Sequence, residues 1–159
     1  MKQFLVYSMV AVMLTVVASC EHSKTVTGPS PSVEAIILFD DHSAITLASD
    51  AAAIEEASIE GDLLSLKTAY GGGCRKHDFK LYGSTSFLES YPVQTDVFLS
   101  HDAHGDACRA LLHDELLFDL SPLKRAYRQM YHGDEGSIYL RIHVPEVGEI
   151  LQLLLLYEF

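Results

Sequence analysis

The chain has 159 residues, of which 48% are hydrophobic and 21% are charged. This composition is typical of one globular domain and argues against a disordered chain. Its 22 acidic residues outnumber the 11 lysines and arginines, for a net charge of -11. We therefore expect no nucleic-acid partner, because phosphate binding depends on lysine and arginine displacing counterions.

The amino terminus has the pattern of a signal peptide over residues 1–19. A short basic start, Met1-Lys2, precedes a nearly continuous apolar run over residues 4–17. That run is shorter than the roughly 20 residues that a helix needs to cross a bilayer. Small residues, Ala18 and Ser19, then provide a cleavage site. The sequence thus predicts a cleaved leader rather than a permanent membrane span.

The four residues Val17-Ala18-Ser19-Cys20 resemble the lipobox of bacterial lipoproteins. This resemblance implies cleavage before Cys20, palmitate and related lipid on that cysteine, and attachment to a membrane. Glu21 stands where the family's inner-membrane retention signal usually has aspartate, so the resemblance favours the outer membrane, facing the periplasm. The alternative is an ordinary secreted protein whose leader happens to end in Ser-Cys.

Residues 20–32 are polar and contain Gly28, Pro29 and Pro31, which is typical of a flexible tether. A single β-rich domain should then cover residues 33–159. Its short apolar runs recur between turn signals, which favours an antiparallel β-sandwich, Ig-like or barrel-like, of about seven or eight strands. The runs from which these strands are expected lie near residues 35–39, 44–48, 54–59, 63–70, 77–82, 93–101, 116–120, 138–144 and 151–159.

Some of these strands carry further expectations. Leu64, Leu66, Thr68 and Tyr70 alternate with polar residues, the period that a half-buried strand requires. Residues 51–57 could instead form a helical turn. The last strand is apolar on both faces over residues 153–156, which predicts a central position in a sheet.

One short helix is predicted near residues 121–132. Ser121 should cap it and Pro122 should occupy its first position, where the missing N–H costs no hydrogen bond. Leu123, Tyr127 and Met130 fall on one helical face and should pack on the sheet.

Two turns rich in cysteine and histidine enclose the middle of the chain, at residues 71–77 and 101–108. If lipid occupies Cys20, then Cys74 and Cys108 remain as an even pair in an oxidising compartment, which predicts a disulfide. The segment Gly72 to Phe79 also resembles one in small uncharacterised bacterial lipoproteins, a resemblance that implies a compartment and no activity.

The histidines of these turns leave a second interpretation open, a metal site. His77 and His101 share the phase of the apolar residues in their strands, so both should point inward, where an imidazole must be hydrogen-bonded or ligated. Zinc or another divalent metal could bind through His77, His101 and His104, with Cys74 or Cys108 as further ligands. Asp102 and Asp106 begin a weak match to a calcium loop, but His113 stands where that loop needs glutamate.

No nucleophile elbow, phosphate loop or zinc-protease motif occurs in the chain. The leading functional hypothesis is therefore a membrane-anchored, non-enzymatic module that binds an envelope protein or supports envelope structure. A metal-binding protein or metalloenzyme built on the three histidines is the second hypothesis. An inhibitor or immunity-type lipoprotein that acts through its loops is the third.

Overall fold

The computed structural model describes residues 32–40 and 45–159. The predicted leader, the lipidation site Cys20 and the tether up to residue 31 lie outside these ranges. Among the described residues, no helix is both long and apolar enough to span a membrane.

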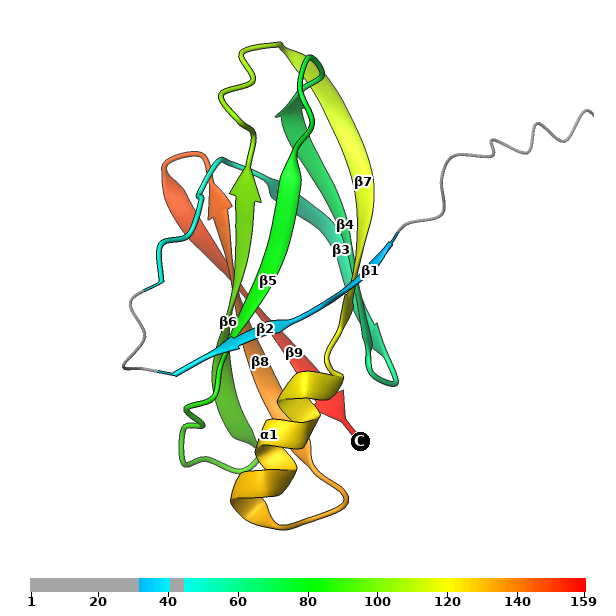
Figure 1. The fold of residues 1–159 in the computed structure, drawn as a ribbon, viewed down its shortest axis with the longest axis vertical. Coiled ribbons are helices and arrows are strands. Elements are labelled where there is room, and N and C mark those ends of the chain that lie inside the picture. The colour runs from blue at the N-terminus through cyan, green and yellow to red at the C-terminus, as the bar shows by residue number, and fades with distance from the viewer. Residues whose placement is uncertain (1–31, 41–44) are drawn as a thin grey trace, which may run out of the picture. The chain divides into compact units, whose positions relative to one another are not determined.

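Two β-sheets and one helix make up the described part of the domain (Figure 1). The four-stranded sheet has the order β1-β7-β4-β3, and the five-stranded sheet has the order β2-β5-β6-β8-β9. The strands are β1 (Val33–Ala35), β2 (Ile37–Phe39), β3 (Ala53–Glu60), β4 (Leu63–Gly72), β5 (Asp78–Ser84), β6 (Val93–Asp102), β7 (Ala110–Asp119), β8 (Ser137–Glu146) and β9 (Glu149–Glu158).

The predicted mainly β sandwich is confirmed, and its two separate sheets rule out the barrel-like variant. The described residues form nine strands, and the sheets are mixed rather than antiparallel. Strand β1 runs parallel to β7, β2 parallel to β5, and β6 parallel to β8. The long connection between β6 and β8, which contains β7 and the helix, lets the chain return to the start of β6 and run beside it in the same direction.

The first predicted strand divides between the two sheets. β1 and β2 are separated only by Ile36, whose side chain is 3% exposed within the core. The Cβ atom of any residue larger than glycine at position 83 would lie 2.7 Å from the Ile36 side chain. Gly83 therefore makes room for the residue at which the chain crosses between the sheets.

Alternating side chains of the two sheets fill the core, as the sequence predicts. In β4 the buried residues are Leu64, Leu66, Thr68 and Tyr70. In β8 they are Ile138, Leu140, Ile142 and Val144. Both sets follow the two-residue period of a strand with one face in the core.

Two strand predictions are wrong, and so is the alternative of a helical turn. Residues 45–48 form no strand, although Ser49 makes an isolated bridge to His101. Residues 53–60 form β3, so the strand predicted near residues 54–59 is confirmed and the helical turn at residues 51–57 is not found. β9 lies at the edge of its sheet, not at the centre. Its outward leucines, Leu154 and Leu156, are exposed, so an apolar pattern on both faces did not mark a buried strand here.

The predicted helix is present as α1 (Ser121–Tyr131), but its start differs from the expectation. Leu120 is the cap residue, and its apolar side chain makes no capping hydrogen bond. Asp119 takes the capping role instead, because its carboxylate accepts hydrogen bonds from the Ser121 N–H and hydroxyl, both at 2.8 Å. Leu123 is fully buried, whereas Met130 is 52% exposed, so the expectation that Met130 packs on the sheet is wrong.

Candidate functional site

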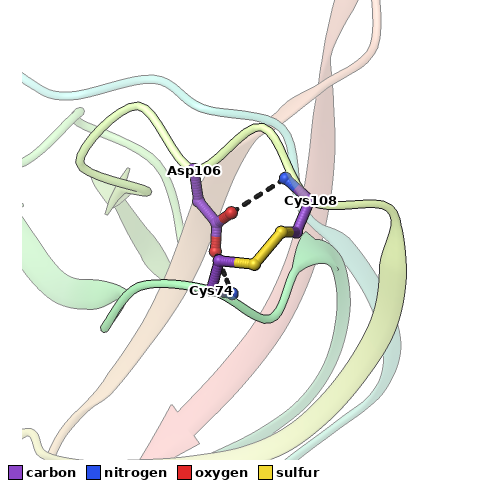
Figure 2. A group of neighbouring side chains, drawn as sticks. All are labelled: Cys74, Asp106 and Cys108. Atoms are coloured by element: carbon purple, nitrogen blue, oxygen red, sulfur yellow. Dashed lines mark hydrogen bonds between the residues drawn. A yellow bond between two sulfur atoms is a disulfide. The ribbon is translucent and has the colours of Figure 1, made fainter.

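The disulfide joins the two turns that the sequence singles out. Cys74 follows β4 and Cys108 precedes β7, which are antiparallel neighbours in one sheet. Their Cα atoms lie 5.9 Å apart and their sulfurs are bonded, as Figure 2 shows. This separation falls within the range of about 4.4 to 6.8 Å found for disulfides. The predicted Cys74–Cys108 bond is confirmed.

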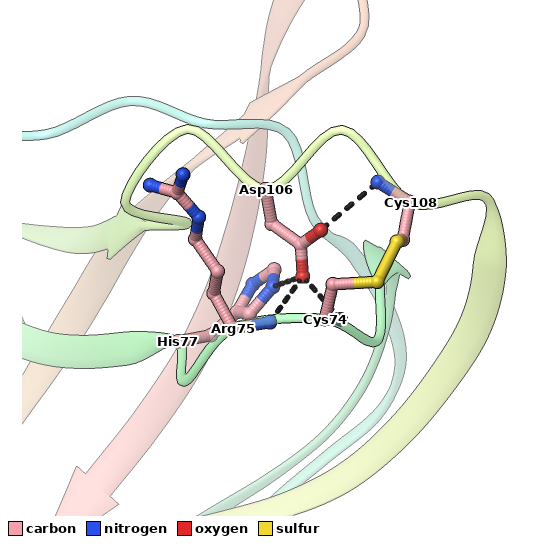
Figure 3. The surroundings of a disulfide bond; sticks show 5 residues. All are labelled: Cys74, Arg75, His77, Asp106 and Cys108. Carbon is pink, nitrogen blue, oxygen red and sulfur yellow. Dashed lines mark hydrogen bonds and ion pairs between the residues drawn. A yellow bond between two sulfur atoms is a disulfide. The ribbon is translucent and has the colours of Figure 1, made fainter.

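Hydrogen bonds to the Asp106 carboxylate also link the same two turns (Figure 3). One carboxylate oxygen accepts a hydrogen bond from the Cys108 N–H at 2.9 Å. The other accepts bonds from the N–H groups of Cys74 and Arg75, at 2.8 and 2.9 Å. These backbone donors, that of Cys108 foremost, hold the pKa of Asp106 well below its usual range, although desolvation acts in the opposite direction. The carboxylate is thus a fixed structural anion beside the disulfide.

The glycine-rich turn is shaped by this arrangement. Gly72 and Gly73 have φ angles of 155° and 113°, which L side chains rarely adopt. A Cβ atom at Gly72 would lie 2.4 Å from the His77 Nε2 atom and 3.1 Å from the Asp106 carboxylate. Glycine is therefore required here both for the backbone conformation and for the close approach of His77.

His77 and His101 meet inside the domain, as their strand phase predicts. The His77 Nδ1 and His101 Nε2 atoms are 2.8 Å apart. His77 Nε2 faces the Asp106 carboxylate at 3.3 Å, and His101 Nδ1 faces the Asp50 carbonyl at 3.0 Å. This row of contacts thus has a hydrogen-bond acceptor at each end, the Asp106 carboxylate and the Asp50 carbonyl.

The number of ring hydrogens limits how many of these contacts are hydrogen bonds. The three contacts need three hydrogens, and two neutral imidazoles carry only two. Burial lowers the pKa of His101, which keeps that ring neutral. With both rings neutral, two of the three contacts can hold a hydrogen, and the two tautomers decide which; the contact between His77 and Asp106 is the longest of the three.

Aromatic rings enclose this pair. Phe79 stacks on His101 with ring centroids 4.2 Å apart and planes inclined by 5°. Tyr70 lies against both histidines, at 4.7 Å from His77 and 5.2 Å from His101. Its hydroxyl donates to the Asp114 carboxylate, and burial with this hydrogen bond raises the pKa of Tyr70. The histidine side chains of the cluster are accordingly shielded from solvent.

His104 and Asp102 lie outside the cluster. The His104 side chain is 45% exposed, and its Nε2 atom contacts the Asp78 carboxylate at 2.8 Å. Asp102 is 47% exposed and lies 3.5 Å from His104 Nδ1. The pKa of Asp78 falls to about 2, chiefly through its hydrogen bond with Lys76 and then that with His104. The structure thus separates His104 from the other two proposed metal ligands.

The described residues contain one group of three ligand-type side chains whose ligand atoms all lie within 4.8 Å of one another: Cys74, Asp106 and Cys108. The two sulfurs are bonded to each other, so neither is a thiolate that could ligate a metal. Asp106 is already engaged by three backbone donors. The chemistry that this arrangement supports is structural cross-linking of two turns.

Sequence reasoning missed the roles of Asp50 and Asp114. Asp50 lies 51 positions before its partner His101 and Asp114 lies 44 positions after Tyr70. Neither belongs to a recognisable motif. Only the pairing of distant segments could have revealed these contacts.

The fold and the site together define a disulfide-stapled β-sandwich protein of two mixed sheets. No protein-family model matches the chain, and no curated protein matches its sequence. Solved structures do share the fold. A NigD-like immunity protein from Bacteroides caccae superposes with a TM-score of 0.59 at 14% identity, covering 79% of this chain and 64% of the other.

Two further structures give similar values. A toxin-related protein from Parabacteroides distasonis has a TM-score of 0.58 at 16% identity, covering 79% of this chain and 60% of its own. A protein of unknown function from Bacteroides vulgatus has a TM-score of 0.55 at 13% identity, covering 81% and 57%. The chain thus spans less than two thirds of the length of these proteins. At such identities the likeness shows a common fold alone.

Proposed function

We propose that this protein is a lipid-anchored bacterial binding protein of the immunity type, which captures a protein toxin at the cell envelope and catalyses no reaction. The observation that carries the proposal is the fold shared with the NigD-like immunity protein over 79% of this chain. The similar fold of a toxin-related protein supports the same class.

The candidate site supports binding rather than catalysis. The side chains of His77 and Asp106 are 2% and 0% exposed, and His101 is 1% exposed. Their polar atoms are engaged with one another and with the backbone. A general base or nucleophile must reach a substrate, whereas these groups stabilise the turns that a partner could contact.

The anchor belongs to the same proposal. We place lipid on Cys20, a cleaved leader at residues 1–19, and the protein on the outer membrane facing the periplasm, all from the lipobox-like residues. The 12 residues between Cys20 and the domain could span at most about 40 Å. Such a tether would hold the domain near the membrane surface and leave it free to meet an incoming protein.

A bacterial growth assay tests the function. The gene is deleted in the native bacterium, and the deletion strain is exposed to concentrated culture supernatant from its parent. The expected result is growth inhibition of the deletion strain alone, reversed by the wild-type gene. Complementation with Cys20→Ala should restore less protection, because the protein is no longer held at the membrane.

Two outcomes would contradict the proposal. Equal growth of parent and deletion strain at all concentrations of a supernatant that inhibits a related strain would exclude an immunity role. Sensitivity of the deletion strain to detergent, without any change in its response to the supernatant, would indicate an envelope-structural module instead.

A further inference from the structure

The outer edge of β9 presents a row of unpaired backbone groups. Gly136 and Phe159 exchange both of their backbone hydrogen bonds, at 2.8 and 3.0 Å. Because bonded and non-bonded positions alternate in an antiparallel pair, the odd-numbered residues of β9 point their N–H and C=O groups at β8. The even-numbered residues point theirs away from β8. No third strand pairs with β9 within residues 32–40 and 45–159.

The side chains of the same even-numbered residues face solvent. Ile150 is 68% exposed, Leu154 58% and Leu156 39%, and Val147 in the preceding turn is 90% exposed. The edge therefore offers both halves of a strand-binding surface: main-chain donors and acceptors, and apolar side chains at every second position.

The other sheet edges are protected, and β9 is not. β1 and β2 are each three residues long. β3 has a register irregularity between Ile54 and Glu56, and it carries three exposed glutamates. Short length, irregular register and charge are the usual devices that prevent a strand from joining another sheet. β9 is ten residues long and has no proline, lysine or arginine.

The charge of the residues near β9 indicates the charge of the partner segment that this edge would bind. Glu158, which is exposed, stands at the carboxyl end of β9, and the strand has no basic residue. β3, which contacts β8 and β9, adds Glu60, whereas its Glu56 is paired with Lys67 and its Glu55 contacts His113. A second copy of this chain would bring the same glutamates and another net charge of -11. The complement is an extended segment with apolar residues in alternation and basic residues at its ends.

We infer that the free edge of β9 binds an extended, basic segment of a partner protein, which joins the five-stranded sheet beside β9. The inference rests on the proposed binding function and names the partner chemistry for it. Main-chain hydrogen bonds to the even-numbered residues would supply affinity, and the glutamates would select a positively charged segment.

Two peptides with the same core test this inference on the full-length protein in detergent micelles. The probe is Lys-Lys-Val-Thr-Val-Thr-Val-Lys-Lys, and the control replaces all four lysines by glutamate. The expected result is that the lysine peptide binds at least about tenfold more tightly than the glutamate peptide. Hydrogen exchange should slow at Ile150, Gln152, Leu154 and Leu156 when the lysine peptide is added.

A matched pair of variants tests the backbone contribution. The Gln152 N–H points away from β8, so Gln152→Pro removes one donor from the free edge and leaves the β8–β9 ladder bonds in place. Gln152→Thr changes the side chain and keeps the donor. The proline variant should bind the lysine peptide about tenfold more weakly, and the threonine variant within about twofold of wild type. If Gln152→Pro fails to fold, the exchange measurement on the wild-type protein decides.

Three results would overturn the inference: equal binding of both peptides, no slowing of exchange on β9, or full affinity in a folded Gln152→Pro variant. Slow exchange at the even-numbered amides of a dimeric protein without peptide would also overturn it, because a second copy would then occupy the edge. The growth assay separates the two proposals. Protection by Gln152→Pro at the wild-type level would reject the β9 site and leave the immunity function standing.

Discussion

Removing the disulfide should cost the domain a large fraction of its stability. Cys74 and Cys108 are separated by 34 positions in the chain. A bond that closes a loop of this length lowers the entropy of the unfolded chain, which corresponds to roughly 4 kcal/mol at 25 °C. The Asp106 hydrogen bonds to both turns remain in the Cys74→Ala/Cys108→Ala variant. The native structure should therefore persist, and the loss should arise in the unfolded state.

Urea and thermal unfolding measure this effect. For a domain of about 127 residues, a loss of 4 kcal/mol corresponds to a decrease in Tm of about 15 °C. The urea m-value should increase, because an unfolded chain without the cross-link exposes more surface. Wild-type protein unfolded in the presence of reductant is the matched control. Its free energy of unfolding should agree with that of the double variant within about 1 kcal/mol.

A loss below about 1 kcal/mol with an unchanged m-value would refute this reasoning. It would mean that the unfolded chain already holds the two turns close together, or that the oxidised native state stores enough strain to cancel the entropic gain. Two titratable thiols in protein purified from the native bacterium without reductant would refute the bond itself.

Three further predictions follow from other parts of the chain. Leu123→Ala should lower the free energy of unfolding, measured by urea melts, by about 3 kcal/mol, because this fully buried leucine joins α1 to the core. The control Met130→Ala removes an exposed side chain and should lower it by less than about 0.5 kcal/mol. Because the pKa of Asp106 is lowered in the folded protein, its stabilising contribution is present above about pH 4 and is lost as the pH falls further. Asp106→Asn should therefore be less stable than wild type at pH 6, and its free energy of unfolding should fall less than that of wild type between pH 4 and pH 2. Cys20→Ala should move the protein from the membrane fraction to the soluble fraction, and an unprocessed variant that stays in the membrane would contradict lipidation at this residue.

The sequence by itself determined the local features of this protein. The two-residue period of β4 located Leu64, Leu66 and Tyr70 in the core, because alternation along a strand assigns each side chain to a face without reference to any neighbour. Cysteine parity, together with the expectation of export, predicted the Cys74–Cys108 bond. Strand phase turned His77 and His101 inward, and the structure confirms that they meet.

Only the tertiary structure decided which segments are neighbours. The period of β9 could not distinguish a central strand from an edge strand, because burial of its second face depends on what packs there and not on its own residues. The division of the first strand at Ile36, the parallel pairing of β6 with β8, and the partners Asp50 and Asp114 all result from contacts between distant parts of the chain. Such contacts depend on how both sheets pack at once, and a local sequence pattern does not specify that packing.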